Sequence, residues 1–251
     1  MLKQPPTNNL TLLVLSRRSP KELAAWLKHI QITNQVIVYA PAADIEDFSQ
    51  VRNSLQLRAQ TDWVLWLDDD EELPLETQQA VAEICQKNSP VIQAVSFPRF
   101  DIFWGEPVTH GEVGGVKLTR LCRRTAGIWH RPVHEFMQIQ GQTFGVSHPI
   151  WHRSHDSIAD FFTSVSRYAA IEGQSRAGAS QGKNIFSTKL MILFQLLFFP
   201  PAKFLYSFGW LQGWRDGLPG LVYSTLMSFH SLMVRFYWYF SLNHHDLYPQ
   251  T

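Results

Sequence analysis

The sequence has few cysteines, no excess of either charge and no long unbroken run of apolar residues. Its two cysteines, Cys85 and Cys122, lie far apart without CxxC spacing, which argues against a zinc knuckle or a disulfide framework and is typical of a reducing compartment. With 22 Lys and Arg against 21 Asp and Glu, no global field draws the chain to nucleic acid. The N-terminus lacks the apolar stretch of a signal peptide, so we expect the amino end to stay in the cytosol.

The chain does have enough apolar residues, 45% of 251, to bury a full core. Apolar runs at 10–16, 35–40 and 62–67 predict buried strands. Helices are predicted between them, one after a Ser19 cap and one over about 48–59. Strands that alternate with helices indicate an α/β fold with a mostly parallel sheet, and ligands of such sheets gather beyond the carboxyl ends of the strands.

The middle of the chain changes in composition. A helix is predicted over 73–87 and one or two strands over 91–105. Residues 116–155 are rich in Arg, His, Gly and aromatics, which favours a site built from loops over a uniform core. A further helix is predicted over 157–172, with Asp156 and Ser157 as cap candidates.

The last eighty residues contain two strongly apolar blocks, 190–208 and 218–240. Gln195, Pro200, Pro201 and Lys203 interrupt the first, and His230 and Arg235 interrupt the second, so neither is a clean membrane span. Aromatic and basic residues among apolar ones favour helices that lie at a membrane surface. A buried helix of a soluble core and a true or re-entrant span are the alternatives. The predicted division is a domain at 1–156 and a helical, membrane-associated region at 157–251.

The stretch "WVLWLDDDEELP" (63–74) places five acids directly after a buried strand. Adjacent carboxylates repel one another, so folding them together needs a cation or several hydrogen-bond donors. Alternate side chains of an extended segment point the same way, so Asp68 and Asp70 can face one Mg²⁺ or Mn²⁺ ion, with a diphosphate as the third party. The alternative is that the acids favour the start of the helix that follows, which suits Glu72 and Glu76.

At this point the residues resemble a known family. "RNSLQLRAQTDWVLWLDDDEELP" is similar to the Asp-x-Asp segment of family 2 glycosyltransferases with the GT-A fold, and the nearest subgroup is the lipopolysaccharide core β-1,4-glucosyltransferases. The likeness continues through "FPRFDIFWGEPVTHG", "RPVHEF", "HPIWHRS" and "GWRDGLPG". It therefore covers most of the chain from 52 to 238.

The resemblance implies roles for individual residues. Asp70 would hold Mn²⁺ or Mg²⁺, His152 would complete the metal shell, and Glu135 would be the general base of an inverting transfer. Asp68 would contact the ribose of the donor or the metal. A structural ion pair with Arg131 or Arg124 remains the alternative for Glu135, and a packed, hydrogen-bonded histidine remains the alternative for His152.

Basic residues are expected to bind the donor. Arg52 opens the Arg-Asn helix of the family segment. Arg120, Arg123, Arg124 and Arg131 form the densest basic group, and guanidinium matches phosphate bidentately. They could bind the pyrophosphate of a UDP-sugar donor or a phosphorylated acceptor, and scattered surface arginines are the alternative. The donor-binding set predicted here is Asp68, Arg52, Arg123 and Arg131.

The sequence departs from the family in the half of the site that would bind the nucleoside. The span from Val38 to Arg52 is too short for the strand and helix that family members carry there. Only Asp44, Glu46 or Asp47 could replace the acid that normally meets the uracil or ribose.

The resemblance implies an inverting, metal-dependent hexosyltransferase of cell-envelope biosynthesis, such as lipopolysaccharide assembly. Its expected partners are a nucleotide sugar, a glycan or glycolipid acceptor and a membrane surface, with no nucleic acid. Its expected location is cytoplasmic, at the inner face of the cytoplasmic membrane. A catalytically silent sugar-binding or scaffold protein is the main alternative. A metal-dependent phosphohydrolase is a third, and it would need more spaced carboxylates and histidines than the chain has.

Overall fold

The computed structural model describes residues 6–41, 47–131, 135–155 and 157–242. The chain forms two compact units, each of which is described by itself. The sheet unit comprises 1–100 and 116–153, and the helical unit comprises 101–115 and 154–251. The domain boundary expected near 156 thus lies close to the second change of unit, but the segment 101–115 also belongs to the helical unit.

Two neighbouring strands of the sheet unit are buried on both faces. β1 (Leu10–Leu15) and β3 (Trp63–Asp68) pair in parallel, and the side chains from Trp63 to Leu67 are fully buried. Strands covered on both faces need apolar side chains at every position rather than at alternate ones. This explains why both segments read as continuous apolar runs, and the strands predicted there are confirmed.

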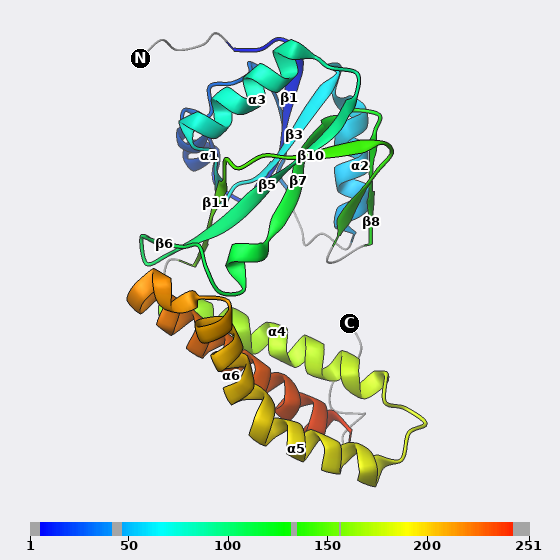
Figure 1. Cartoon of the computed structure of the whole chain (residues 1–251). Helices are drawn as coiled ribbons and strands as arrows, with labels where there is room; N and C mark the ends of the chain where they lie inside the picture. The colour runs from blue at the N-terminus through cyan, green and yellow to red at the C-terminus, as the bar shows by residue number, and fades with distance from the viewer. Residues whose placement is uncertain (1–5, 42–46, 132–134, 156, 243–251) are drawn as a thin grey trace. The chain divides into compact units, whose positions relative to one another are not determined.

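Helices cover the two faces of these strands (Figure 1). On one face, alternate side chains such as Leu12 and Leu65 pack with α1 (Pro20–Leu27) and α3 (Leu75–Lys87). On the other face, side chains such as Leu13 and Trp66 pack with α2 and with a small hairpin. The sheet unit therefore has three layers. The elements that cover the second face are α2 (Phe48–Arg58), β8 (Gly127–His130) and β9 (Phe136–Ile139).

The start of α1 follows directly from its sequence. The hydroxyl of Ser19 accepts from the backbone N–H of Glu22, and the carboxylate of Glu22 accepts from the backbone N–H of Ser19. This reciprocal pair satisfies two N–H groups that have no partner within the helix. The cap predicted at Ser19 is confirmed.

The expectation of a mostly parallel sheet is wrong, because the sheet is mixed. β2 (Gln35–Tyr39), β1 and β3 are parallel, but β7 (Lys117–Arg123) runs antiparallel to both β3 and β5 (Ile92–Phe103). Among the described residues the strand order is β2-β1-β3-β7-β5-β11-β4, with β6 and β10 also paired to β5. The alternation of strands and helices that predicts parallel pairing stops after α3.

Residues 116–155 form strands rather than the loops expected from their composition. Besides β7, β8 and β9, the segment contains β10 (Gln142–Gly145) and β11 (Ile150–His155). β10 is exposed at all four positions, and β9 alternates between exposed and half-buried residues. Short strands with so much exposed surface carry Arg, Gly and polar residues, which is why their composition resembled that of loops.

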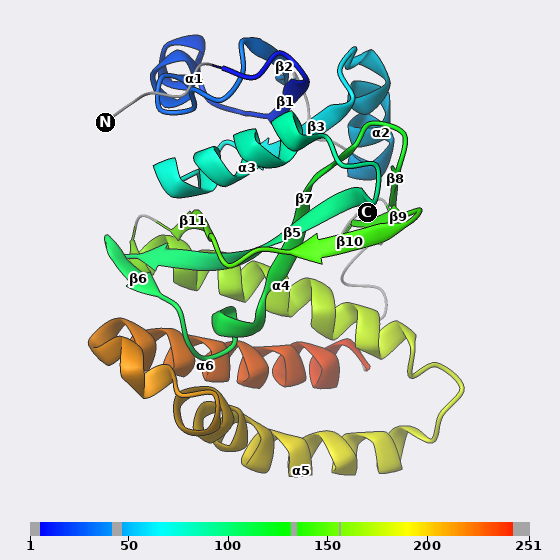
Figure 2. The ribbon, with the colours of Figure 1, turned by 45° about the horizontal axis from the view of Figure 1, so that its top comes forward.

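The helical unit is built around α6 (Gly217–Ser241), which packs against both α4 (Ile158–Gly178) and α5 (Ile185–Phe204) (Figure 2). α4 and α6 approach closely at Gly173, where a Cβ atom would lie 2.5 Å from the Cβ of Tyr237. The side chain of Ser157 caps α4, as expected, and Asp156 lies outside the described residues. A strand pair is also present, because β6 (Glu106–Val108) pairs with the last residues of β5.

The segment "GWRDGLPG" forms the entry to α6. A short turn of helix, η3 (Gly213–Asp216), leads directly into it, and a Cβ atom on Gly220 would lie 2.0 Å from the carbonyl oxygen of Gly213. No side chain fits between two backbones at that separation. The glycines of this motif therefore allow the chain to fold back on itself.

The outer face of α5 is apolar and exposed. Buried positions such as Thr188 and Ile192 face the rest of the unit. The outward side chains are 49% to 76% exposed and comprise Phe186, Leu190, Leu193, Phe194, Leu197, Phe198 and Leu205. In the described part of the chain, one helix, Ile185–Trp210, is long and apolar enough to cross a membrane, and only 17% of its most apolar stretch is buried. An apolar patch of this size on the surface is unusual for a soluble monomer.

Candidate functional site

The five acids form a tight turn at the carboxyl end of β3. Asp68 ends β3, Asp69 and Asp70 make the turn, and β4 (Glu71–Glu72) follows. Because β1 is parallel to β3 and pairs Leu15 with Asp68, the carboxyl end of β1 lies beside the same turn. The acids thus stand at the sheet edge where sequence analysis predicted a ligand site.

Two arginines compensate the buried half of the run. Asp68 accepts hydrogen bonds from Nη2 of Arg52 and from Nη2 of Arg120, each 2.9 Å long and each to a different oxygen. Glu71 is fully buried and accepts from Nη2 of Arg120 and, at 3.1 Å, from the backbone N–H of Asp68. Arg120, itself buried, is therefore shared by two carboxylates.

This sharing separates the pKa values of the two carboxyl groups. Burial raises the pKa of Glu71 above its ordinary value, and the negative charge of Asp68 raises it further. The charge of Arg120 lowers the pKa of Glu71 but does not cancel this rise. Burial acts upward on Asp68 too, but the charges of Arg120 and Arg52 outweigh it and hold the pKa of Asp68 well below its ordinary value. Asp68 is thus the firmly ionised member of the pair.

Asp69 and Glu72 are bound by other neighbours. One oxygen of Asp69 accepts from the hydroxyl of Ser16 at 2.7 Å and from the backbone N–H of Arg17 at 3.0 Å, both just beyond β1. Glu72 forms an ion pair with Arg153 of β11. These two acids hold the turn to its neighbours.

Asp70 faces a histidine. Its Oδ2 lies 3.3 Å from Nε2 of His152, with the Asp70 side chain 46% exposed and the His152 side chain 17% exposed. The pairing follows from β11, which runs antiparallel to β4 and places His152 opposite Glu71, while the backbone N–H of Arg153 donates to the carbonyl of Asp70. The structure therefore brings the two predicted metal ligands together from positions 82 residues apart in sequence, 70 and 152.

Glu135 also joins this cluster. Its Oε1 accepts from Nε of Arg52 at 3.0 Å, so Arg52 bridges Glu135 and Asp68. The Arg52 guanidinium carbon lies 5.2 Å from the ring centre of Trp66 and 4.7 Å from that of Trp129, and Nη1 of Arg52 has no hydrogen-bond partner among the described residues. Two aromatic faces thus hold a buried cation between two carboxylates. The alternative ion pair considered for Glu135 is real, but its partner is Arg52 rather than Arg131 or Arg124.

Arg123, predicted to bind the donor, lies at the other end of the sheet. β7 pairs Arg123 with Trp63, the first residue of β3, so five residues of β3 separate it from Asp68. Its guanidinium donates to the Asn88 side chain and the Ser89 carbonyl and covers the ring of Trp63 at 4.2 Å. The donor-binding role of Arg123 is therefore corrected to a structural one.

Arg131 and Asp47 are two further residues that the sequence analysis considered for contact with the donor. Arg131 is exposed and its guanidinium lies 5.4 Å from the ring centre of Phe136, outside the hydrogen-bonded cluster of Asp68. Asp47, considered for the nucleoside contact, caps α2 by accepting from the backbone N–H of Gln50. Asp44 and Glu46 lie outside the described residues.

Arg120 is the residue whose importance the sequence reasoning missed. The sequence analysis groups Arg120 with Arg123, Arg124 and Arg131 and does not predict its ion pairs with Asp68 and Glu71. The available indication was its position within "KLTRLCR", where a charged residue precedes the buried Leu121 and Cys122 of β7. A charge inside an apolar strand needs an opposite charge nearby, and five acids were the obvious source.

The expectation that Asp68 and Asp70 share one cation is also corrected. Both oxygens of Asp68 are engaged by arginine, whereas Asp70 turns to His152. Arginine supplies the positive charge that we had assigned to a metal at Asp68. The ligand pair that remains for a metal is Asp70 and His152.

The Asp70 and His152 pair fits a divalent ion that is shared with a ligand. Two adjacent ligands on one octahedral Mg²⁺ or Mn²⁺ stand about 3 Å apart, close to the separation of these two atoms. No group of three or more His, Cys, Asp or Glu side chains that could hold a metal occurs among the residues described. The pair is therefore suited to an ion that takes its other ligands from phosphate oxygens and water.

A second polar cluster lies in the helical unit. Asp216 accepts from the backbone N–H groups of Thr109 and His110 at 2.9 and 2.7 Å, and from both of their side chains. Burial raises the pKa of Asp216, but the hydrogen bonds from His110 and Thr109 outweigh it and hold the pKa below its ordinary value. This explains the acid of "GWRDGLPG" as the residue that fixes the segment 109–110 to the entry of α6.

No protein-family model matches the chain, and no curated protein is significantly similar to it. The chemistry of the cluster is therefore defined by its own residues. They are a buried Arg–carboxylate network, a half-buried Asp–His pair and a carboxylate, Glu135, at the border of the network.

Proposed function

We propose that the chain is an inverting, metal-dependent glycosyltransferase of the GT-A type. It would move a sugar, expected to be a hexose, from a nucleotide-sugar donor to a cell-envelope glycan or a lipid-linked acceptor. The observation that carries the proposal is the Asp70–His152 pair, whose facing atoms lie 3.3 Å apart. The pair lies close in sequence to Asp68, and Arg52 connects Asp68 to Glu135. The resemblance to family 2 enzymes assigned metal binding and base catalysis to these same positions.

The proposed transfer gives Glu135 the role of base. As the acceptor hydroxyl oxygen bonds to the anomeric carbon, the bond from that carbon to the diphosphate breaks on the opposite face, and Glu135 takes the hydroxyl proton. Nε of Arg52 holds one oxygen of Glu135 in place at 3.0 Å. Arg52 is thus a positioning residue for the base.

Asp70 and His152 would hold Mn²⁺ or Mg²⁺. When bound, such an ion neutralises the charge that grows on the departing diphosphate. Half of the Asp70 side chain faces solvent, which leaves room for a diphosphate beside it. Asp68 would then support this turn through Arg52 and Arg120 rather than bind the ion.

We expect Asp70→Asn to weaken UDP binding in the presence of Mn²⁺ by at least about tenfold, since a charge-assisted contact contributes about 1.5–3 kcal/mol. Isothermal titration calorimetry with UDP, with and without Mn²⁺, measures this. The matched control is Glu83→Gln, which removes an exposed acid of α3 that pairs with Lys87. Equal affinities in wild type and Asp70→Asn would remove the metal role from Asp70.

A catalytically silent, sugar-binding or scaffold protein is the second candidate. The observation that favours it is the engagement of Asp68 and Glu135 by arginine, together with the short nucleoside region. Carboxylates held in ion pairs can stabilise a fold without any ligand. Calorimetry separates the two candidates, because a scaffold would give no heat with UDP and Mn²⁺ in the wild type.

The helical unit supports a place at the membrane surface. From Asn184 to Leu242 its charged residues are Lys189, Lys203, Arg215 and Arg235 against Asp216, and Asp216 is already bonded to His110. Trp210 and Trp214, at the end of the apolar helix, are 79% and 58% exposed. An apolar face with basic and aromatic residues is suited to a bilayer with anionic lipids.

We expect the full chain to float with phosphatidylglycerol-containing vesicles, and Leu193→Glu with Leu197→Glu to reduce partitioning by at least about tenfold. Each leucine loses about 1.5–3 kcal/mol of apolar burial. Leu57→Glu is the control, because Leu57 is an exposed leucine of α2 in the sheet unit. A wild-type chain that stays in the soluble fraction would contradict the membrane role.

A further inference from the structure

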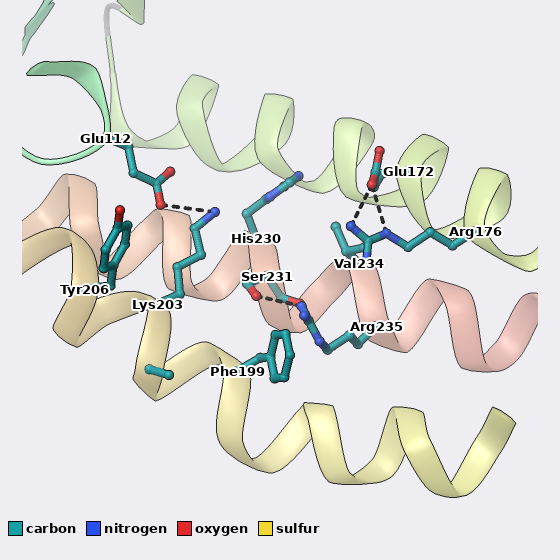
Figure 3. Close-up of a pocket in the computed structure, with 11 residues that line it drawn as sticks. Glu112, Glu172, Arg176, Phe199, Lys203, Tyr206, His230, Ser231, Val234 and Arg235 are labelled. Atoms are coloured by element: carbon teal, nitrogen blue, oxygen red, sulfur yellow. Dashed lines mark hydrogen bonds and ion pairs between the residues drawn. The ribbon is translucent and has the colours of Figure 1, made fainter. Parts of the chain in front are cut away.

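A cavity of about 420 Å³, open to solvent, lies between α4, α5 and α6 of the helical unit (Figure 3). This volume is within the range of small-molecule sites. Its charged lining residues are three cations and two carboxylates, with His230, Phe199 and Tyr206 completing much of the wall. The charged residues are Arg176, Lys203, Arg235, Glu112 and Glu172.

Both carboxylates of the cavity already have a cation. Lys203 lies 3.3 Å from Glu112, and Arg176 makes two contacts of 2.9 Å with Glu172 (Figure 3). These two pairs cancel, and the lining retains the charge of Arg235. The cavity is therefore positive.

Arg235 is buried, and no acid of the described residues forms an ion pair with it. It is 6% exposed, and its Nη1 donates to the hydroxyl and the carbonyl of Ser231, each at 2.7 Å. Its guanidinium covers the ring of Phe199 at 4.4 Å, and its Nε has no hydrogen-bond partner among the described residues. A buried cation without a counter-ion is costly, so an anion that enters the cavity would be stabilised there.

The remaining lining indicates which anion. Guanidinium matches phosphate in a planar, two-bonded arrangement, and the ammonium group of Lys203, although paired with Glu112, has further N–H donors for a phosphate oxygen. Burial, followed by the charge of Lys203, lowers the pKa of His230, so at neutral pH its imidazole adds hydrogen-bonding capacity rather than another charge. α5, which contributes Phe199 and Lys203 to the cavity, also carries the exposed apolar face. An amphiphile with a phosphate at one end satisfies both features.

We propose that this cavity binds a phosphate group, held by Arg235 and Lys203, and that in the membrane-bound chain the phosphate belongs to a lipid. The proposal does not depend on glycosyl transfer, because it uses residues of the helical unit alone. It is tested by binding without any sugar donor. Its failure would leave the calorimetric test of UDP and Mn²⁺ untouched.

The test is calorimetric titration of the full chain in an uncharged detergent with three probes. The probes are dihexanoyl phosphatidate, dihexanoyl glycerol and inorganic phosphate. We expect phosphatidate to bind and the uncharged glyceride to bind at least about tenfold more weakly, since the phosphate supplies the charge-assisted contacts. Inorganic phosphate that binds as well as phosphatidate would identify free phosphate as the source, and phosphate that binds more weakly would identify the lipid.

Variants decide whether Arg235 is responsible. We expect Arg235→Gln to lose at least about tenfold in affinity for phosphatidate, and Lys203→Gln to lose affinity in the same direction. Arg167→Gln, which removes an exposed charge of α4 outside the cavity, should bind as the wild type does. If Arg235→Gln does not fold, Arg235→Lys and Lys203→Gln carry the test. Absence of phosphatidate binding, equal binding of the glyceride, or variants that all bind like wild type would overturn the proposal.

Discussion

Replacing Arg120 by methionine is expected to lower the free energy of unfolding of the sheet unit by about 3–5 kcal/mol. Arg120 is buried and donates to both Asp68 and Glu71. Without it, Glu71 remains fully buried beside another carboxylate and has no cation of its own. Methionine fills much of the same volume, so the loss reports the missing charge rather than a cavity. Denaturant titration followed by the fluorescence of the buried Trp63 and Trp66 measures it.

The matched control is Arg123→Met on the same strand. Arg123 donates to neutral acceptors, the side chain of Asn88 and the carbonyl of Ser89, so its loss should cost about 1–2 kcal/mol. Adding Glu71→Gln to Arg120→Met should restore part of the stability, because it removes the uncompensated buried charge. Equal losses for the two arginine variants, with no recovery in the double variant, would show that the carboxylates do not depend on Arg120.

A Glu135→Gln variant is expected to lose about 10²–10⁴-fold in turnover while its affinity for the donor stays within a few-fold of wild type. Glutamine has the same shape and its amide oxygen can still accept from Nε of Arg52. It cannot take a proton from the acceptor hydroxyl. Release of UDP from a UDP-sugar with Mn²⁺ and a lipid-linked glycan acceptor gives kcat, and calorimetry with UDP and Mn²⁺ gives the affinity.

The control for this variant is Glu83→Gln, an exposed acid of α3 that pairs with Lys87. It should change neither turnover nor affinity. A Glu135→Gln variant that loses donor affinity but keeps turnover at saturation would assign Glu135 to the positioning of Arg52. A wild-type chain that retains its fold and releases no UDP from any UDP-sugar would contradict the enzymatic proposal itself.

The first half of the sheet unit could be predicted from the sequence because its signals are local. β1 and β3 are continuous apolar runs, and α1 begins at a Ser19 cap whose partner, Glu22, is three residues away. Such features depend on neighbours in the chain. The predicted limits of these elements are within a residue or two of those observed.

The second half could not be predicted in the same way. β8 to β10 are short and largely exposed at one face, so neither a long apolar run nor a strict alternation identifies them. Their pairing depends on residues distant in sequence: β7, for example, pairs Val64 with Cys122 and Ala94 with Cys122. The change from parallel to antiparallel pairing at β7 has no local signature in the sequence.

In the candidate site, too, local features could be predicted from the sequence and contacts between distant segments could not. That the five acids need positive partners followed from their charge alone, and Asp70, His152 and Glu135 were named from their motifs. Which side chain each acid would meet depends on the register of β7 and β11, which brings Arg120 to Asp68 and His152 to Asp70. Sequence reasoning therefore paired Asp70 with His152 correctly, but it did not identify the arginines that bind Asp68 and Glu135.

The residues that bind the five acids lie far apart in the sequence, so they leave the ribosome at different times during synthesis. A nascent polypeptide that has left the ribosome only as far as β4 already contains Arg52, Ser16 and Arg17, which bind Asp68 and Asp69. Arg120, His152 and Arg153 have not yet emerged, so Glu71, Asp70 and Glu72 lack their partners. The mutual repulsion of these acids disfavours early closure of this edge. The N-terminal strands can settle at the turn only after β7 and β11 have been translated, so the sheet is expected to complete itself late and from its carboxyl side.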